Sequence, residues 1–554
     1  MNLSGWNMKR ITHVQFRQIK YGVFSVILTL TLIMATISGA ISTLFSINSA
    51  FGQGVVAPPE PVVIGQVNSG PPPASNIFNL PSGYKIQPVL WNLTLPSTVT
   101  FDDNGTMYVA ESGYSYGDFK PIPRILKVDL KHNRVQVLVD RGLNGPITDI
   151  EFNKHTGVLY VSHRGIISAV DMRGHIKDLI VGLPSMGDHH NNQIAIGPDG
   201  RSYFGQGTVT NTGVAGEDSY TYGWLRTSPE LHDIPCKDIK LTGQNFNSSN
   251  PLTPQNLTDA AQTGAFVPFN HTTTKGQVIK GDVKCSGSVI SSNANGTDLR
   301  VIAWGLRNPY GVALTNDGKK LIVVNNGADE RGSRRVANDT DKVYSIDLSN
   351  SSAQYLGWPD YFGNGEPVTD KKFVSESARS DNNPLQFLLQ DHPTVLKPLS
   401  LLEEGVAVTQ VAISNSTDFG FKGKAFITEF GTMAPLIHPF AQLTQSMPGF
   451  QPNITGQKVI TLDPSTGKNT DFLSLKAVDK SFRPIGAKFN LNGDSLYIVS
   501  IGKTEIRTNV PVNNQTSSGL YPFATIHAMP WAYANTGVVW KISRDTARND
   551  TSTP

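Results

Sequence analysis

The chain has 554 residues, with 47 Lys and Arg against 44 Asp and Glu, so its formal net charge is only +3. Charged residues make up 16% of the chain and no Lys/Arg run follows a readable face, which argues against nucleic acid as a partner. The 51 Gly and 35 Pro suit a fold of many short strands and turns.

An uncharged apolar stretch occupies residues 21–47. Four basic residues precede it: Lys9, Arg10, Arg17 and Lys20. The stretch is long enough to cross a bilayer as a helix, and the basic flank predicts that the N-terminus stays in the cytoplasm. A signal peptide cleaved near Ala50 is the alternative. In both cases residues 1–50 predict export, so the bulk of the chain is either membrane-anchored outside the cytoplasm or secreted.

Asn-X-Ser/Thr sequons, which are glycan acceptors in exported proteins, agree with this prediction. They include Asn92, Asn104, Asn247, Asn256, Asn270, Asn295, Asn338, Asn350, Asn415, Asn453 and Asn514.

Residues 51–80 are rich in Pro and Gly and predict an extended linker. Beyond it, one pattern recurs six times: an apolar strand, a turn containing Gly, a second apolar strand and, later, a third. The copies span 99–128, 150–170, 194–290, 312–346, 411–460 and 487–542. One such sheet cannot bury both of its faces, whereas several packed in a ring can, so the repeat predicts an all-β, six-bladed β-propeller over 81–545. Tyr84–Leu93 is expected to supply the last blade's missing strand and lock the ring.

Two insertions interrupt the repeats, over 211–284 and 364–400, and a polar tail follows at 546–554. The only cysteines, Cys236 and Cys285, lie in and directly after the first insertion. In an oxidising compartment they predict one disulfide that pins this insertion. A two-thiol metal or redox site is the alternative, but it lacks CxxC spacing and His partners.

Ligands of propellers bind at the central channel, so polar residues directly before the innermost strands are candidate site residues. Asp188, His189 and His190 stand immediately before the third copy. Such a density of polar groups is costly unless they are solvated or used in binding or catalysis. The alternatives are a solvated loop, or a histidine satisfied by a backbone carbonyl.

Arginines occupy the corresponding points of the fourth and sixth copies: Arg307, followed by Asn308, and Arg483. A guanidinium offers a fork of donors that suits a carboxylate or a quinone oxygen. Two such charges converging on one channel repel unless an anion lies between them, which points to an acidic ligand. Alternatively, Arg307 stacks on an aromatic ring or bridges two blades.

Carboxylates, Asn side chains and turn carbonyls gather after the fourth copy's second strand, over 325–330, 338–341 and 355–360. Calcium uses these ligand types, although the spacing is not that of an EF-hand. A hydrated acidic loop is the alternative.

These segments resemble the glucose/sorbosone dehydrogenase family, six-bladed propellers related to soluble pyrroloquinoline quinone (PQQ) glucose dehydrogenase. The resemblance covers residues 80–545, and its most specific motifs are at 187–200 and 304–311, with shorter matches at 326–329, 357–360 and 483–486. It implies that His189 is the catalytic base, that Asp188 either holds the tautomer of His189 or faces the substrate, and that Arg307 and Asn308 bind the quinone oxygens. It also implies that Arg483 pairs with a cofactor carboxylate. The carbonyls of Gly327 and Ala328 would hold one calcium ion, and Asp341 and Tyr355 would belong to a second site.

The chain departs from the family pattern in three places. No lysine matches the one expected to bind the cofactor, Lys397 being only a candidate; the fifth entrance, 405–410, lacks a basic residue or His; and the acidic pair near the second calcium reads Asp341-Lys342. The sequence therefore predicts an exported PQQ- and calcium-dependent dehydrogenase that oxidises a sugar, aldose or other alcohol and passes electrons to an extracytoplasmic carrier. A non-catalytic propeller that binds glycans or a cell-surface partner is the main alternative, and a calcium-dependent hydrolase or lactonase is a further one.

Overall fold

Each repeat folds into one antiparallel sheet because a tight turn reverses the chain between its first two apolar strands. Every one of these six turns places a glycine at positive φ, a conformation that residues with a Cβ adopt only with strain. The six are Gly105, Gly157, Gly200, Gly318, Gly423 and Gly493. The computed structural model describes residues 66–113, 121–253, 259–375, 385–432, 455–507 and 529–545.

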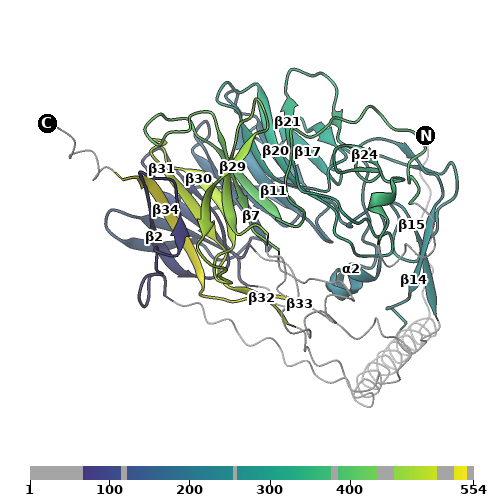
Figure 1. Cartoon of the computed structure of the whole chain (residues 1–554), viewed down its shortest axis with the longest axis horizontal. Helices are drawn as coiled ribbons and strands as arrows, with labels where there is room; N and C mark the ends of the chain where they lie inside the picture. Colours follow the sequence, from purple (N-terminus) through teal and green to yellow (C-terminus); the bar gives the residue numbers. More distant parts are fainter. Residues whose placement is uncertain are drawn as a thin grey trace, which may run out of the picture. The chain divides into compact units, whose positions relative to one another are not determined.

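The first three sheets, or blades, follow one another along the chain (Figure 1). Blade 1 contains β3 (Pro96–Phe101), β4 (Met107–Glu111), β5 (Arg124–Asp129) and β6 (Arg134–Val139). Blade 2 contains β7 (Ile147–Asn153), β8 (Val158–His163), β9 (Ile166–Val170) and β10 (Ile176–Val181). Blade 3 contains β11 (Asn191–Ile196), β12 (Ser202–Gln206), β17 (Ser288–Ser292), β18 (Arg300–Trp304) and, parallel at its edge, β22 (Gln354–Tyr355).

The remaining three blades complete the six-bladed propeller. Blade 4 contains β19 (Asn308–Leu314), β20 (Lys320–Asn326), β21 (Lys342–Asp347) and β25 (Ser400–Leu401). Blade 5 contains β26 (Val408–Ile413), β27 (Ala425–Glu429), β28 (Lys458–Leu462), β29 (Asn469–Leu475) and β1 (Phe78–Asn79). Blade 6 contains β30 (Pro484–Phe489), β31 (Ser495–Ser500), β34 (Gly537–Arg544) and β2 (Tyr84–Leu93).

Strand β2 confirms the predicted ring closure, since Tyr84–Leu93 pairs antiparallel with β34 along its whole length. The preceding strand β1, which falls in the predicted linker, also joins the propeller by pairing with β29. It does so because Phe78 is buried between blades 5 and 6, packed edge-on against Phe482 and Trp540.

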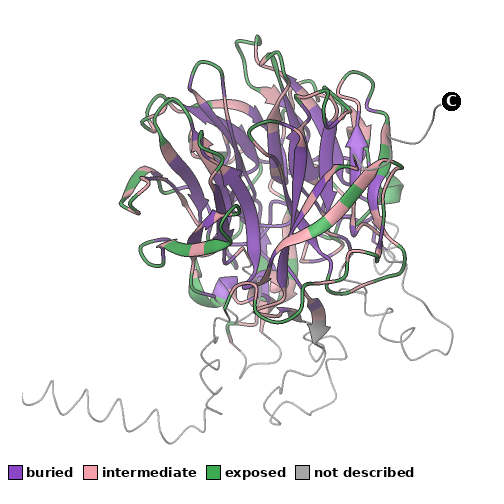
Figure 2. Cartoon of the chain, turned by 90° about the vertical axis from the view of Figure 1, so that its left-hand side faces the viewer, coloured by how far each residue is buried: buried purple, intermediate pink, exposed green. Residues whose placement is uncertain are grey.

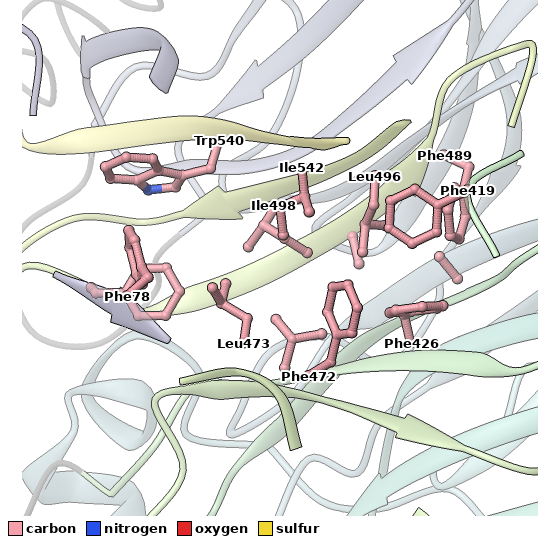
Figure 3. Close-up of a cluster of buried hydrophobic side chains, with 14 of the residues drawn as sticks. Phe78, Phe419, Phe426, Phe472, Leu473, Phe489, Leu496, Ile498, Trp540 and Ile542 are labelled. Carbon is pink, nitrogen blue, oxygen red and sulfur yellow. The ribbon is translucent and has the colours of Figure 1, made fainter. Parts of the chain in front are cut away.

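The hydrophobic core lies between neighbouring blades, and Figure 2 shows buried strands with exposed turns along the edges. The largest aromatic cluster joins blades 5 and 6 (Figure 3). In it Phe426 and Phe472 meet edge to face with ring centroids 4.9 Å apart, a favourable geometry for aromatic pairs. Burial of each such side chain contributes roughly 1.5–3 kcal/mol.

The innermost strands β3, β7, β11, β19, β26 and β30 each contact the innermost strands of the blades on either side, and β30 contacts β3. In every blade, leaving aside the edge strands β1, β2 and β22, the innermost strand comes first along the chain and the next strands follow outward in antiparallel order. The six innermost strands therefore run in the same direction and begin at the same rim of the ring. We call this the entrance rim.

The helices α2 (Glu217–Thr221) and α3 (Trp224–Thr227) belong to the first insertion. The hairpin β32 (Thr504–Arg507)–β33 (Met529–Ala532) links β31 to β34. Both α2 and this hairpin lie on the lower side of Figure 1.

Polar side chains fill the axis below the entrance rim and join the blades. The side-chain oxygen Oε1 of Gln193 accepts from the backbone N–H groups of Val312 and Val411 at 3.1 and 3.0 Å, which links blades 3, 4 and 5. Gln410 donates to the Asp149 carboxylate at 2.8 Å, and the same carboxylate accepts from Ile194 N. Burial raises the pKa of Asp149 to about 7. The axis is therefore a cross-blade hydrogen-bond lattice rather than an open pore.

Smaller elements belong to the insertions. They are the hairpins β13 (Ile239–Lys240)–β16 (Val278–Ile279), β14 (Asn245–Ser249)–β15 (Ala260–Gly264) and β23 (Tyr361–Phe362)–β24 (Glu366–Pro367), and a 3₁₀ turn at Lys371–Phe373. The predicted disulfide is confirmed: Cys236 and Cys285 are bonded, with Cα atoms 4.9 Å apart.

Several predictions about export fall on residues that the structure does not describe, namely the apolar stretch 21–47, residues 51–65 of the linker, Asn256, Asn453, Asn514 and the tail 546–554. Among the described residues, none of the helices has the length and apolar character needed to cross a bilayer. Seven sequon asparagines are exposed: Asn104, Asn247, Asn270, Asn295, Asn338, Asn350 and Asn415. Glycosylation of them stays a prediction.

Candidate active site

Asp188 and His189 lie at the entrance rim, in the segment that leads from β10 into β11. Their backbone N–H groups donate to the carbonyls of Val209 and Thr208, at 2.9 and 3.0 Å. A Cβ on Gly207 would lie 2.3 Å from the Cβ of His189, so only glycine permits this approach. The local chain thus fixes His189, which is only 7% exposed.

The hydrogen bonds around His189 select one tautomer of its ring. Nδ1 lies 3.2 Å from the Thr208 carbonyl oxygen, which can only accept. The Thr208 hydroxyl, 3.5 Å from Nδ1, donates its own hydrogen to the carbonyl of Thr210 and so also offers a lone pair. Nδ1 therefore carries the proton, and Nε2 is left with its lone pair.

Burial, opposed by Asp188 and aided by Arg307 and Arg331, lowers the pKa of His189 to about 4. The imidazole is consequently neutral at physiological pH. A neutral imidazole with a bare Nε2 is the form that accepts a proton as a general base.

Asp188 is buried beneath His189 and contacts two guanidinium groups. Its Oδ2 forms an ion pair with Nη2 of Arg331, and lies 3.3 Å from Nη2 of Arg307 and 3.7 Å from Nε2 of His189. Burial alone would raise the pKa of Asp188, but Arg331, His189 and Arg307 outweigh burial and hold it below its ordinary value. Asp188 is thus a fixed anion beside the base.

Arg307 stands one residue before β19, at the point of blade 4 that corresponds to His189 in blade 3. Its guanidinium donates to Asn211 at 3.0 Å, to the Gly327 carbonyl at 2.6 Å and to Asp329 at 2.7 Å, in addition to Asp188. Its carbonyl accepts from Thr208 N, so Thr208 bridges the His189 and Arg307 segments. The structure therefore brings the predicted imidazole, guanidinium and turn together on one rim.

Asn308, the residue after Arg307, is held in a row of amides. Its Oδ1 accepts from Asn192 at 2.8 Å and its Nδ2 donates to Asn326 at 2.7 Å. The side chain of Asn325 accepts from the backbone N–H of both Arg307 and Asn308 at 3.0 Å. One amide thus sets the direction in which both predicted ligand-binding side chains leave the chain.

Arg331 is a member of the site that sequence reasoning missed. It is 5% exposed, and besides Asp188 it binds Asp218 of α2 and, at 3.0 Å through Nε, Asp329. Its guanidinium lies 5.2 Å from the ring centroid of Tyr222. Two arginines and three aspartates thus form one ion cluster, which we call the compensated cluster: Arg307, Arg331, Asp188, Asp218 and Asp329.

The first insertion supplies Asp218 to this cluster, and it also supplies Asn211 and Tyr222, which contact Arg307 and Arg331. Asp233 anchors the start of the insertion by accepting from the N–H groups of Val209 and Thr210, at 2.7 and 3.2 Å. The disulfide partner Cys236 follows three residues later. The insertion is therefore a wall of the site rather than a peripheral loop.

The Gly327-Ala328 turn lies beside Arg307, and both of its N–H groups and the Gly327 carbonyl already have hydrogen-bond partners. The N–H groups of Gly327 and Ala328 donate to Asp341 and Asp339, at 2.8 and 2.7 Å, and the Gly327 carbonyl accepts from Arg307. Asp341 also accepts from Val408 N. Burial raises the pKa of Asp341 to about 6.

Tyr355 lies in β22 at the edge of blade 3, whereas Asp341 directly precedes β21 of blade 4. Its ring packs on Trp304 at 4.3 Å and its hydroxyl donates to the Gly357 carbonyl. Among the described residues, no three His, Cys, Asp or Glu side chains gather as a metal site. The candidate Lys397 is exposed beside Gly365, in the second insertion.

Arg483 stands one residue before β30, at the same rim, but its surroundings differ from those of Arg307. It donates to three backbone carbonyls, those of Phe430, Gly431 and Thr432 at 3.1–3.3 Å, and to the Thr504 hydroxyl. Burial lowers its pKa to about 10. Among the described residues no carboxylate pairs with it, so Arg483 is a nearly buried cation (6% exposed) without a counter-ion.

No family model matches the chain, and no curated protein matches it either. Solved structures that it resembles include the holo form of the pyranose dehydrogenase PQQ domain from Coprinopsis cinerea, with 16% identity, 86% of this chain and 99% of that chain covered, and a TM-score of 0.49. They also include the PQQ-bound aldose sugar dehydrogenase from Streptomyces coelicolor (13% identity, 84% and 100% covered, TM-score 0.45). A calcium structure of a Trichoderma reesei carbohydrate-active enzyme of family AA12 matches at 14% identity, with 87% and 100% covered and a TM-score of 0.47. At such identities and TM-scores, what this site does has to be inferred from its own residues.

Proposed function

We propose that this chain is an exported, PQQ-dependent dehydrogenase that oxidises a sugar, an aldose or another alcohol. The observation that carries the proposal is His189: a buried imidazole with its Nδ1 proton fixed on a carbonyl and its Nε2 lone pair unused, at the rim where a propeller binds its ligands. Such a group serves to remove a proton from a substrate hydroxyl.

The residues around His189 suit that step. As Nε2 accepts the hydroxyl proton, the ring becomes an imidazolium, and the Asp188 carboxylate at 3.7 Å stabilises the new charge. Because Arg307 and Arg331 hold Asp188 ionised, it does not compete with His189 for the proton. Asp188 thus acts through electrostatics and orientation.

Arg307 and Asn308 are proposed to orient a quinone oxygen. Of the five guanidinium N–H groups of Arg307, four are directed at Asn211, Gly327, Asp188 and Asp329, which leaves one. Asn308 likewise keeps one of its two amide N–H groups. Two rigidly held donors suit a quinone oxygen that gains negative charge.

Arg483 suits the quinone cofactor, because a carboxylate of PQQ would be the counter-ion that Arg483 lacks among the described residues. When bound, PQQ supplies the two-electron acceptor that sugar oxidation needs. Calcium fits less directly, because a divalent cation would have to displace Arg307 from the Gly327 carbonyl. We derive no step through calcium, and its sites at Gly327, Ala328, Asp341 and Tyr355 stay predictions.

Export and the electron carrier complete the proposal. The apolar stretch 21–47 and the disulfide support an oxidising location outside the cytoplasm. Reduced quinone must be reoxidised, so a separate extracytoplasmic carrier is required. Membrane anchoring and the identity of that carrier are part of the proposal.

The test is reconstitution of the purified chain with PQQ, with and without calcium, followed by dye reduction with a panel of sugars. The parent protein should bind quinone and reduce dye, whereas His189→Ala should bind quinone, seen by its absorbance, and lose turnover by about 100-fold or more. His155→Ala, an exposed histidine in the β7–β8 turn at the opposite rim, is the matched control. Quinone-independent sugar binding with no dye reduction would instead indicate a binding propeller, and full activity of His189→Ala would contradict the role of this residue.

A further inference from the structure

Asp329 is the member of the compensated cluster that reaches solvent. Its side chain is 57% exposed, whereas the side chains of the other four members are at most 9% exposed. It follows β20, which ends at the entrance rim because it is the second strand of blade 4. The cluster therefore presents one carboxylate to whatever approaches this rim.

Hydrogen bonds hold Asp329 in place although it is exposed. Asn211 accepts from its backbone N–H at 3.0 Å and donates to its carbonyl at 2.6 Å. Nη2 of Arg307 and Nε of Arg331 both donate to its Oδ2, at 2.7 and 3.0 Å. Among the described residues, no printed length of chain contributes a donor to Oδ1 of Asp329, so this oxygen is the one that a ligand can use.

Contacts in series join Asp329 to the proposed base. Oδ2 of Asp329 lies 2.7 Å from Nη2 of Arg307, and the same Nη2 lies 3.3 Å from Oδ2 of Asp188. That Asp188 oxygen is in turn 3.7 Å from Nε2 of His189. A hexose that offers one hydroxyl to Nε2 of His189 can therefore offer a second hydroxyl to Asp329.

The charge of Asp329 decides which groups it can bind. Burial alone would raise its pKa, but Arg307 and Arg331 outweigh burial and hold the pKa below its ordinary value. The carboxylate is thus ionised at neutral pH, and the cluster of two arginines and three aspartates has one formal negative charge in excess. An ionised carboxylate accepts from hydroxyl and ammonium groups and repels another carboxylate.

We propose that Asp329 is a substrate-binding residue that selects neutral and amino sugars, because its Oδ1 accepts a sugar hydroxyl or ammonium group and its charge keeps acidic sugars away from His189. This inference rests on the proposed dehydrogenase function. A rigid acceptor loses little freedom on binding, so the contact adds affinity at low cost. Asp329 takes no part in proton transfer.

The test compares glucose, glucosamine and glucuronate as ligands of the full chain, by calorimetric titration with and without bound quinone and by dye reduction. The parent should bind glucose at least about tenfold more tightly than glucuronate, and glucosamine at least as tightly as glucose. Asp329→Asn removes the charge and keeps the shape of the side chain. It should bind glucose about tenfold more weakly and lose most of the discrimination against glucuronate, with KM raised and kcat nearly unchanged.

Asp298→Asn is the matched control. Asp298 is also bound by two arginines, Arg201 at 2.9 Å and Arg300 at 2.6 Å, and its side chain is 41% exposed. It lies in the turn between β17 and β18, at the opposite rim. This substitution should leave the affinities for all three sugars unchanged.

The results separate this inference from the proposed function. Unchanged affinities in a folded Asp329→Asn overturn the inference and leave Asp329 a counter-ion of the arginines, while dye reduction by the parent still supports the dehydrogenase. Discrimination that depends on Asp329 without any dye reduction keeps the binding residue and rejects the dehydrogenase. If Asp329→Asn fails to fold, the parent decides: equal or tighter binding of glucuronate than of glucose, or no binding of any of the three sugars, overturns the inference.

Discussion

Arg331 and Arg483 are both nearly buried at the entrance rim, yet their surroundings are opposite. Arg331 touches three aspartates in the compensated cluster beside blades 3 and 4, whereas Arg483 in blade 6 contacts carbonyls, a hydroxyl and, at 5.4 Å, the ring of Phe430, but no carboxylate of the described residues. Buried charges are tolerated when paired, so the first arginine belongs to the folded protein alone. The second points to an anion that arrives from outside. The rim thus has one half in which protein carboxylates balance the arginine charges, and this half holds His189. In the other half the charge of Arg483 stays unbalanced until a ligand binds.

Replacing Arg331 should have the largest effect, because it breaks the compensated cluster. Arg331→Met leaves Asp188 and Asp218 without their main partner and should lower the free energy of unfolding by about 3–5 kcal/mol, with loss of turnover. Urea unfolding and dye reduction measure the two effects. Arg141→Met, which removes a guanidinium that is 90% exposed, should change neither. Unchanged stability of Arg331→Met would mean that the cluster is not closed in solution.

Removing the disulfide should also destabilise the half of the rim that holds the compensated cluster, by somewhat less than the Arg331 substitution does. A Cys236→Ser, Cys285→Ser double variant should lose about 3–4 kcal/mol by the chain-entropy argument for a loop with a sequence separation of 49 residues. Hydrogen exchange should rise within 211–284, which carries Asp218 and Tyr222, while blade 6 keeps its protection. Uniform loss of protection in all blades would contradict the division of the rim.

Replacing Arg483, unlike replacing Arg331, should have little effect on stability and a large effect on quinone binding. Arg483→Gln should cost only about 1 kcal/mol of stability, since an amide still reaches one of the carbonyls and removal of an unpaired charge offsets part of the loss. Quinone affinity, followed by absorbance or calorimetry, should fall by roughly 30-fold because a carboxylate loses its partner. Unaltered quinone affinity would leave Arg483 with a structural role only.

The smallest effect concerns pH. Since burial lowers the pKa of His189 to about 4, kcat/KM should stay level from neutral pH downward and fall only as pH approaches about 4. The folded pKa lies below that of an unfolded histidine, about 6.5, so the unfolded chain binds this proton first and stability declines as pH falls from about 6.5 to 4. A more conservative substitution of Arg331 that still folds should shift the acid limb of the kcat/KM profile to higher pH, because Arg331 is one of the charges that lower the pKa of His189. An acid limb near pH 6.5 in the parent would contradict the buried, neutral imidazole.

Local patterns were sufficient to predict the blades and the entrance residues. Alternating strands with glycine turns identify each copy, and position before an innermost strand identifies His189, Arg307 and Arg483. The ring closure by Tyr84–Leu93 also follows from a strand without a partner in its own copy.

The partners of these residues could not be predicted, because they come from distant parts of the chain. Arg331 reaches Asp188 across 143 positions and Asp218 across 113, and no motif links such pairs. Gln410, at an entrance that lacks a basic residue, still joins blades 5, 6 and 2 through Asp149 and Ala487. Sequence gives the residue types at the rim, whereas the division into compensated and unpaired charges depends on the folded ring.

The pairing of β2 with β34 also bears on how the protein is made. These two strands are synthesised at opposite ends of the propeller, and β2 waits longer for its partner β34 than β1 waits for β29, which is made earlier. A nascent chain therefore carries unpaired Tyr84–Leu93 until its last strand leaves the ribosome, and any product truncated before Gly537 retains this exposed, apolar edge. Completion of translation is thus a condition for sealing the toroid, and premature termination should yield material that chaperones retain or proteases remove.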